Sequence, residues 1–190
     1  MLQNYIKTIY KKSFYMKKKI VIFATLLIII LIGLYTIKGE DEFKSIEINK
    51  TSNIYNKGGT KYMDTLLYIG LDMLDIRGVT IVIRDLGEGK KIDSGTTLRA
   101  YIRNVGNQYV LYIANMGRRE AIKVISHELI HIKQYNEGRL IDSGEDIIWC
   151  GDTISKGELV GINYFERGWE VEAFKKQDSL DFLILNKLYK

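Results

Sequence analysis

Apolar and polar residues follow each other with a changing period along this chain of 190 residues. Apolar positions recur every three to four residues over 61–76, which predicts an amphipathic helix. Segments rich in β-branched and aromatic residues are typical of strands and occur at 43–49, 79–83, 97–103 and 109–114. A tight turn around Gly106 joins the last two of them. This order of elements predicts an α+β fold with a mixed β-sheet.

The longest helical pattern runs from Arg119 to Glu137. It contains no glycine or proline, and Gly138 follows it as a C-terminal cap. Apolar residues occupy most of the circumference of this helix. They are Ala121, Ile122, Val124, Ile125, Leu129, Ile130 and Ile132. A helix that is apolar nearly all round is normally buried. We expect the strip that reaches solvent or a cleft to carry Lys123, Lys133 and Gln134.

The same helix contains both histidines of the chain, in the sequence His127-Glu128-Leu129-Ile130-His131. Residues four apart lie about one turn from each other on one helix face, so both imidazoles can reach one metal ion. Zn²⁺ suits such a site, because it accepts nitrogen ligands and tolerates an open position for water. Glu128 can take a proton from that water. In the alternative interpretation, the histidines are hydrogen-bonded members of a packed helix, but burying these groups without partners would be costly.

A third protein ligand has to be a carboxylate, because the chain has no further histidine and no second cysteine. Glu166, Glu170 and Glu172 compete for this role where a loop enters a predicted final helix. Helical phase separates two of them. Glu170 shares its face with Ala173 and Phe174, whereas Glu172 shares its own with lysines. The phase therefore points Glu170 inward and makes it the predicted ligand.

His127 to His131, followed 39 residues later by Glu170-Val171-Glu172-Ala173, resembles the gluzincin type of zinc metallopeptidase. In that family two motif histidines and a glutamate from a downstream helix hold zinc, and an alanine often stands three residues after the glutamate. The resemblance covers roughly residues 97–180. It implies a small zincin-like domain with a mixed β-sheet, an active-site helix and a C-terminal helix. Trp169 replaces the asparagine of better known members, and no metzincin-type ligand follows, so no subfamily is assigned.

The function expected from these residues is zinc-dependent hydrolysis of a peptide bond. Zn²⁺ is the expected cofactor, with His127, His131 and Glu170 as metal ligands and Glu128 as the general base. Two alternatives stay open. One is a catalytically inactive zincin-like binding protein at the membrane surface, and the other is a zinc amidase acting on cell-wall peptide.

The expected substrate is a peptide or protein. An extended peptide can add to an edge strand above the metal by backbone hydrogen bonds, and we favour 109–114 as that edge. Tyr164 and Tyr135 are candidate hydrogen-bond donors to a tetrahedral oxyanion, and Arg167 is a further candidate.

A second strong pattern lies near the start of the chain. Residues 20–37, IVIFATLLIIILIGLYTI, form 18 positions without a charge, close to the roughly 20 that cross a bilayer. Lysines precede this run and acidic residues follow it, so the positive-inside rule predicts a C-terminal domain outside the cytoplasm. The run exceeds the usual signal core, and no clear Ala-x-Ala site follows. We favour a single-pass transmembrane helix over secretion after signal cleavage, with Met16 as an alternative start to Met1.

These patterns divide the chain into a basic cytoplasmic N-terminus (1–19), a transmembrane anchor (20–37), a juxtamembrane segment (38–50) and a metallopeptidase-like domain (51–190). The net charge of +5 comes from the first 39 residues, whose seven lysines face no acid, while 21 basic and 23 acidic residues remain after them. The domain lacks the concentrated positive charge of a nucleic-acid binder. We therefore expect membrane contact through 20–37 and no nucleic-acid partner. The lone Cys150 is expected to be a small buried residue.

Overall fold

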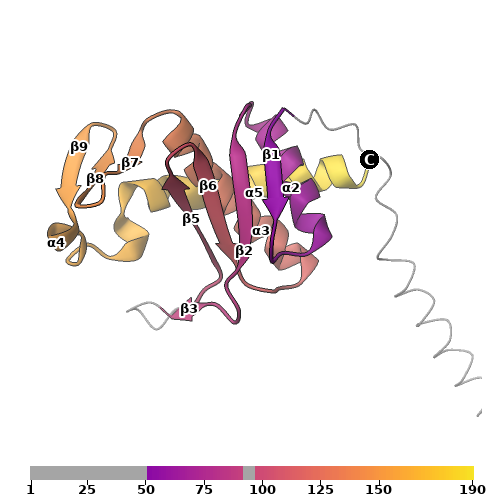
Figure 1. The fold of residues 1–190 in the computed structure, drawn as a ribbon, viewed down its shortest axis with the longest axis horizontal. Coiled ribbons are helices and arrows are strands. Elements are labelled where there is room, and N and C mark those ends of the chain that lie inside the picture. The colour runs from indigo at the N-terminus through magenta and orange to yellow at the C-terminus, as the bar shows by residue number, and fades with distance from the viewer. Residues whose placement is uncertain (1–50, 92–96) are drawn as a thin grey trace, which may run out of the picture. The chain divides into compact units, whose positions relative to one another are not determined.

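The main sheet has four strands in the order β1-β2-β6-β5 (Figure 1). Their bounds are β1 Asn53–Asn56, β2 Thr80–Asp85, β5 Ala100–Val105 and β6 Gln108–Ile113. Strands β1, β2 and β6 are parallel, whereas β5 pairs antiparallel with β6. A short hairpin of β3 (Lys90–Lys91) and β4 (Thr97–Leu98) precedes β5. The predicted mixed sheet and α+β class are confirmed.

The computed structural model describes residues 51–91 and 97–190. The predicted segments 1–19, 20–37 and 38–50, and with them the strand expected at 43–49, lie outside the described residues. Among the residues that are described, no helix is both long enough and apolar enough to cross a membrane.

The prediction that 109–114 forms the edge of the sheet is wrong. Strand β6 covers these residues and lies between β2 and β5, so it is hydrogen-bonded on both sides. The reason is that β2 pairs in parallel with β6, which leaves the outer position to its hairpin partner β5. The edge next to the motif helix is therefore β5.

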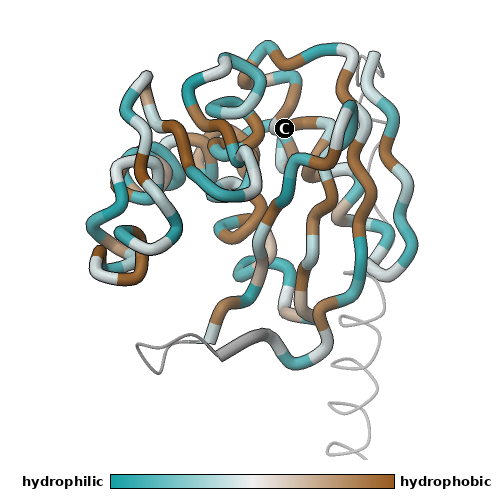
Figure 2. The backbone as a smooth tube through the Cα atoms, turned by 60° about the vertical axis from the view of Figure 1, so that its left-hand side comes forward, coloured by the Kyte–Doolittle hydropathy of each residue, from teal (hydrophilic) through white to brown (hydrophobic). Residues whose placement is uncertain are grey.

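Three helices lie together on one face of this sheet: α2 (Lys61–Met73), α3 (Arg118–Asn136) and α5 (Gly168–Leu188) (Figure 1). The predicted helices at 61–76 and 119–137 are confirmed with small changes at their ends. The core lies between the two layers and includes side chains that are at most 1% exposed, among them Leu66, Ile81, Ile83, Leu111, Ile122 and Ile125. Figure 2 shows hydrophobic stretches along the strands that meet this core.

Helix α3 ends in a Schellman motif. Gly138 follows the last turn with a φ of 68°, a left-handed conformation that favours glycine. The N–H of Arg139 then donates to the carbonyl of Gln134 at 3.0 Å. The predicted glycine cap is confirmed. It ends the helix after Asn136 and places Arg139 beside the last turn.

A second, antiparallel sheet occupies the segment between α3 and α5. Its strands are β7 (Leu140–Asp142), β8 (Asp146–Trp149) and β9 (Asp152–Ser155), and the short helices α4 (Lys156–Leu159) and η1 (Tyr164–Glu166) follow. A small cluster of Leu140, Ile147 and Trp169 packs this sheet against the start of α5. Cys150 is exposed at the β8–β9 turn with a φ of 52°, so the expectation that it is buried is wrong. The apolar run before it ends in a turn.

Candidate metal centre and active site

Two helices bring the predicted ligands together. Helix α3 carries His127 and His131 one turn apart, and the first turn of α5 presents Glu170 to both. One ligand atom from each residue lies within 4.8 Å of the others, and all three side chains are buried. The two Nε2 atoms are 3.1 Å apart, and Glu170 Oε2 lies 3.1 Å from His127 Nε2 and 3.4 Å from His131 Nε2. This His-His-Glu cluster could hold a metal ion.

The outer nitrogens of both imidazoles face amide oxygens. His127 Nδ1 lies 3.0 Å from Gln177 Oε1, and His131 Nδ1 lies 2.8 Å from Gln134 Oε1. An amide oxygen only accepts hydrogen bonds, so each Nδ1 carries a proton. In the neutral tautomer that follows, both Nε2 lone pairs point into the cluster, where they meet a carboxylate oxygen. Three electron-rich atoms at this spacing require a cation among them, either a proton or a metal ion.

The electrostatics of the cluster agree with that requirement. Burial alone would lower the pKa of His131, but the hydrogen bond and charge of Glu170 outweigh it and raise this pKa to about 9. Burial alone would raise the pKa of Glu170, but hydrogen bonds to His127 and His131 hold it at about 2. The pocket therefore keeps the Glu170 carboxylate ionised and favours positive charge at His131.

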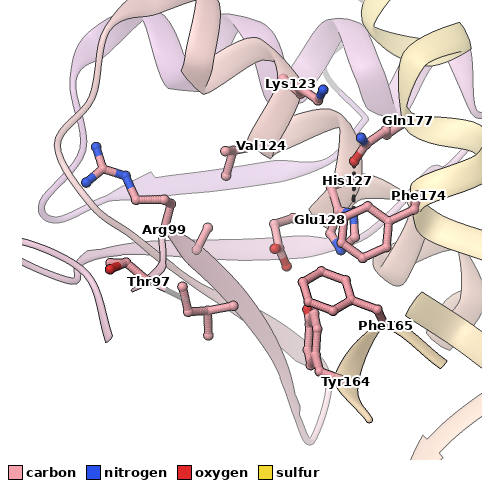
Figure 3. Close-up of a pocket in the computed structure, with 12 residues that line it drawn as sticks. Thr97, Arg99, Lys123, Val124, His127, Glu128, Tyr164, Phe165, Phe174 and Gln177 are labelled. Carbon is pink, nitrogen blue, oxygen red and sulfur yellow. Dashed lines mark hydrogen bonds between the residues drawn. The ribbon is translucent and has the colours of Figure 1, made fainter. Parts of the chain in front are cut away.

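Glu128 is adjacent to the cluster and is 4% exposed. Burial raises the pKa of its carboxyl group, while the positive charge of the imidazoles and a hydrogen bond from the Ile102 backbone N–H oppose that rise. Its Oε2 atom has no hydrogen-bond partner among the described residues. Figure 3 shows the carboxylate pointing into a cavity. A buried acid with one free oxygen is suited to accept a proton from a molecule bound in that cavity.

The competing carboxylates lie elsewhere. Glu166 is exposed in η1, and Glu172 is hydrogen-bonded by Arg139 at 2.6 and 3.2 Å. The predicted distinction between Glu170 and Glu172 by helical phase is consistent with this arrangement, because Glu170 is the one that joins the cluster.

Two glutamines were missed as members of the site. Gln134 was expected on the strip of α3 that reaches solvent or a cleft, but it is completely buried and contacts His131. Gln177 is 7% exposed and contacts His127. The available signal was their spacing: Gln134 follows His131 by three positions, and Gln177 follows Glu170 by seven, both on one helical face.

Two cavities meet at Glu128. The larger, of about 250 Å³, lies on the His127 side and is walled mainly by apolar groups, including Leu98, Val124, Phe165 and Phe174 (Figure 3). The smaller, of about 140 Å³, lies on the His131 side, between β5 and the start of α5. Leu98, Glu128 and Tyr164 line both. Cavity space therefore lies on both sides of Glu128, alongside the edge strand.

Tyr164 and Tyr135 both reach the cleft, but in different places. Tyr164 lies where the two cavities meet, and burial together with the charge and a hydrogen bond of Glu170 raises its pKa. Tyr135 lines the smaller cavity, and burial raises its pKa to about 12. Both hydroxyls are thus protonated donors at neutral pH. Arg167 packs on the Tyr164 ring, 5.5 Å from its centroid, and lines neither cavity.

Comparison of this chain with models of protein families, with curated proteins and with solved structures finds no match.

Proposed function

We propose that this chain is a zinc-dependent hydrolase that cleaves peptide bonds by attack of water. The observation that carries the proposal is the buried Glu128 carboxylate, which lines the cleft, has one oxygen without a hydrogen-bond partner among the described residues, and stands directly beside the His-His-Glu cluster. A general base needs this combination of access to the reacting proton and exclusion from bulk water.

The size of the cluster supports Zn²⁺ as the ion. Zinc binds histidine nitrogen and carboxylate oxygen at roughly 2.0–2.1 Å, so the ligand atoms on one tetrahedral face lie about 3.3–3.4 Å apart. The three distances in the cluster are 3.1, 3.1 and 3.4 Å. Three protein ligands and an open fourth position are typical of catalytic zinc sites.

The residues divide the chemical work. Zinc, when bound, lowers the pKa of a water molecule and polarises the scissile carbonyl. Glu128 accepts the proton of the attacking water and later delivers it to the leaving amine. Its raised pKa suits the first step, because a carboxylate of higher pKa accepts a proton more readily. Tyr164 is the better placed of the two tyrosines to donate a hydrogen bond to the oxyanion, because it stands where the cavities meet.

The cleft supports an extended peptide as substrate. Strand β5 is an edge, and the Ile102 N–H points from it toward Glu128. An added strand can hydrogen-bond to such an edge while its side chains enter pockets. The larger cavity is smaller than the roughly 300–1,000 Å³ of sites that enclose whole ligands, so it fits one apolar side chain. Because space continues on both sides of Glu128, the substrate would extend in both directions.

The alternative of an inactive binding protein is less favoured, since burying Glu128 without full hydrogen bonding costs free energy and serves no purpose without catalysis. A zinc amidase acting on cell-wall peptide uses the same chemistry. The predicted location outside the cytoplasm, with attachment through residues 20–37, remains part of the proposal and is testable by protease accessibility in intact cells.

The deciding experiment compares the full chain with Glu128→Gln, using Glu166→Gln as the matched control. Each protein is assayed for bound zinc by elemental analysis and for products by mass spectrometry, with a peptide library and with peptidoglycan. We expect Glu128→Gln to keep zinc and lose at least about 100-fold in rate, as for removal of a general base. Full activity in Glu128→Gln would remove Glu128 from the base role, and cleavage of peptidoglycan alone would favour the amidase.

A further inference from the structure

Gln134 contacts both helices that carry the ligands. It lies on α3, three residues after His131, and it is 0% exposed. Its Oε1 accepts a hydrogen bond from His131 Nδ1 at 2.8 Å, and its Nε2 donates to the carbonyl of Trp169 at 3.0 Å. Trp169 immediately precedes Glu170. A single side chain thus spans the gap between the two ligand-bearing segments.

The surroundings determine which way the Gln134 amide points. Its Nε2 atom faces two acceptors, the Trp169 carbonyl and Glu172 Oε2, the latter at 3.4 Å. Rotating the amide by half a turn would place its oxygen against both of them, so the amine must lie on that side. Oε1 is then fixed toward His131, and the Nε2 lone pair of that imidazole is directed at the metal cluster.

Glu172 is held in turn by Arg139. The guanidinium donates from Nη1 and Nη2 to both carboxylate oxygens, at 2.6 and 3.2 Å, and Lys176 adds a second ion pair. The Schellman motif at the end of α3 places Arg139 beside this carboxylate, because the Arg139 N–H donates to the Gln134 carbonyl at 3.0 Å. Gln134, Glu172 and Arg139 therefore form a closed ring of hydrogen bonds behind the cluster.

We propose that Gln134 is a positioning residue that fixes the orientation of His131 and its separation from Glu170, and that the Arg139–Glu172 ion pair holds Gln134 in place. This inference depends on the proposed function only in assuming that the three ligands hold a metal ion. Residues that hydrogen-bond a metal-bound histidine typically change metal affinity by about 10–100-fold when replaced.

The test uses the full chain and two variants. Gln134→Met keeps similar bulk but removes every hydrogen bond of the amide, and Glu172→Gln removes the charge that orders it. Glu137→Gln is the matched control, because Glu137 also accepts from Arg139, at 2.8 Å, but among the described residues no side-chain hydrogen bond joins it to Gln134. Zinc affinity is measured by competition with a chromophoric chelator, and coordination geometry by the visible absorption of the Co²⁺-loaded protein. Circular dichroism reports whether each variant is folded.

We expect Gln134→Met to weaken zinc binding by about 10–100-fold and to alter the Co²⁺ bands, Glu172→Gln to do both by a smaller factor, and Glu137→Gln to do neither. Unchanged affinity and unchanged Co²⁺ bands in folded Gln134→Met would overturn the proposal. If Gln134→Met does not fold, Glu172→Gln decides by the same criterion. A wild-type chain that binds no zinc would instead overturn the metal site itself, and one that binds zinc without hydrolysis would overturn only the proposed reaction.

Discussion

Replacing Glu170 with glutamine removes one charge from the cluster while keeping the shape of the side chain. In the metal-free protein, the pKa of Glu170 is about 2 and that of His131 about 9, against ordinary values of 4.5 and 6.5. The two pKa shifts arise from the same interaction between Glu170 and His131, so their free energies are not added. A tenfold change in proton affinity corresponds to about 1.4 kcal/mol, so the interaction contributes about 3 kcal/mol to stability.

The stability that this interaction contributes depends on pH in a characteristic way. Because the pKa of Glu170 is lowered, its contribution is complete above about pH 4.5 and is lost as the pH falls toward about 2. Because the pKa of His131 is raised, its contribution is complete below about pH 6.5 and is lost as the pH rises through about 9. The stability difference between wild type and Glu170→Gln should therefore be largest between pH 4.5 and 6.5 and shrink on either side.

The assay is thermal unfolding followed by circular dichroism in the presence of a chelator, at pH 3, 5.5 and 9.5. At pH 5.5 we expect the variant to unfold about 10 °C below wild type, as a loss of about 3 kcal/mol implies for a domain of this size. Glu166→Gln, at an exposed position, is the control and should leave the midpoint unchanged. Equal midpoints at pH 5.5, or a difference that is the same at all three values, would refute the charge interaction. Zinc-loaded Glu170→Gln should also release its metal more readily.

Three further predictions follow from the cleft and its supports. Tyr164→Phe should lower the kcat of the zinc-saturated protein by about 100-fold, because it removes one donor to the oxyanion; an unchanged kcat would exclude that role. Phe174→Ala should lower kcat/KM by about 10–100-fold for substrates with a bulky apolar residue at the cleaved bond, but not for substrates with a small one. Phe182 is 64% exposed on the same helix, so Phe182→Ala should have no such effect. Equal losses on both substrates would argue against the pocket. Gly168→Ala should destabilise the fold by about 1–3 kcal/mol, because its Cβ would lie 2.3 Å from Trp149 Nε1, while Gly157→Ala, with its nearest contact at 3.9 Å, serves as control in the same thermal assay.

Local periodicity was sufficient to predict which residues belong to the His-His-Glu cluster. The four-residue spacing of His127 and His131 is a property of one helix, and the inward phase of Glu170 is a property of another. Both hold before any tertiary contact is known. What the spacing could not give is that α3 and α5 pack together closely enough to bring the three ligand atoms within 4.8 Å.

The incorrect predictions concern features that depend on pairing between distant segments. Gln134 is polar and was expected to reach solvent or a cleft, but it accepts a hydrogen bond from His131 and donates to Trp169 and Glu172, which only the fold brings together. The prediction that 109–114 forms the edge of the sheet was wrong, because the order of strands in the sheet does not follow their order in the chain. Cys150 ends an apolar run and was expected inside, yet the backbone turns there.

The ligands belong to helices joined by residues 137–167, which include the whole β7–β9 sheet. An ion bound by both helices would cross-link the two ends of this segment and reduce the conformational entropy of the chain between them. Metal loading would then control how readily the segment between the two helices opens and how fast an added protease cuts it.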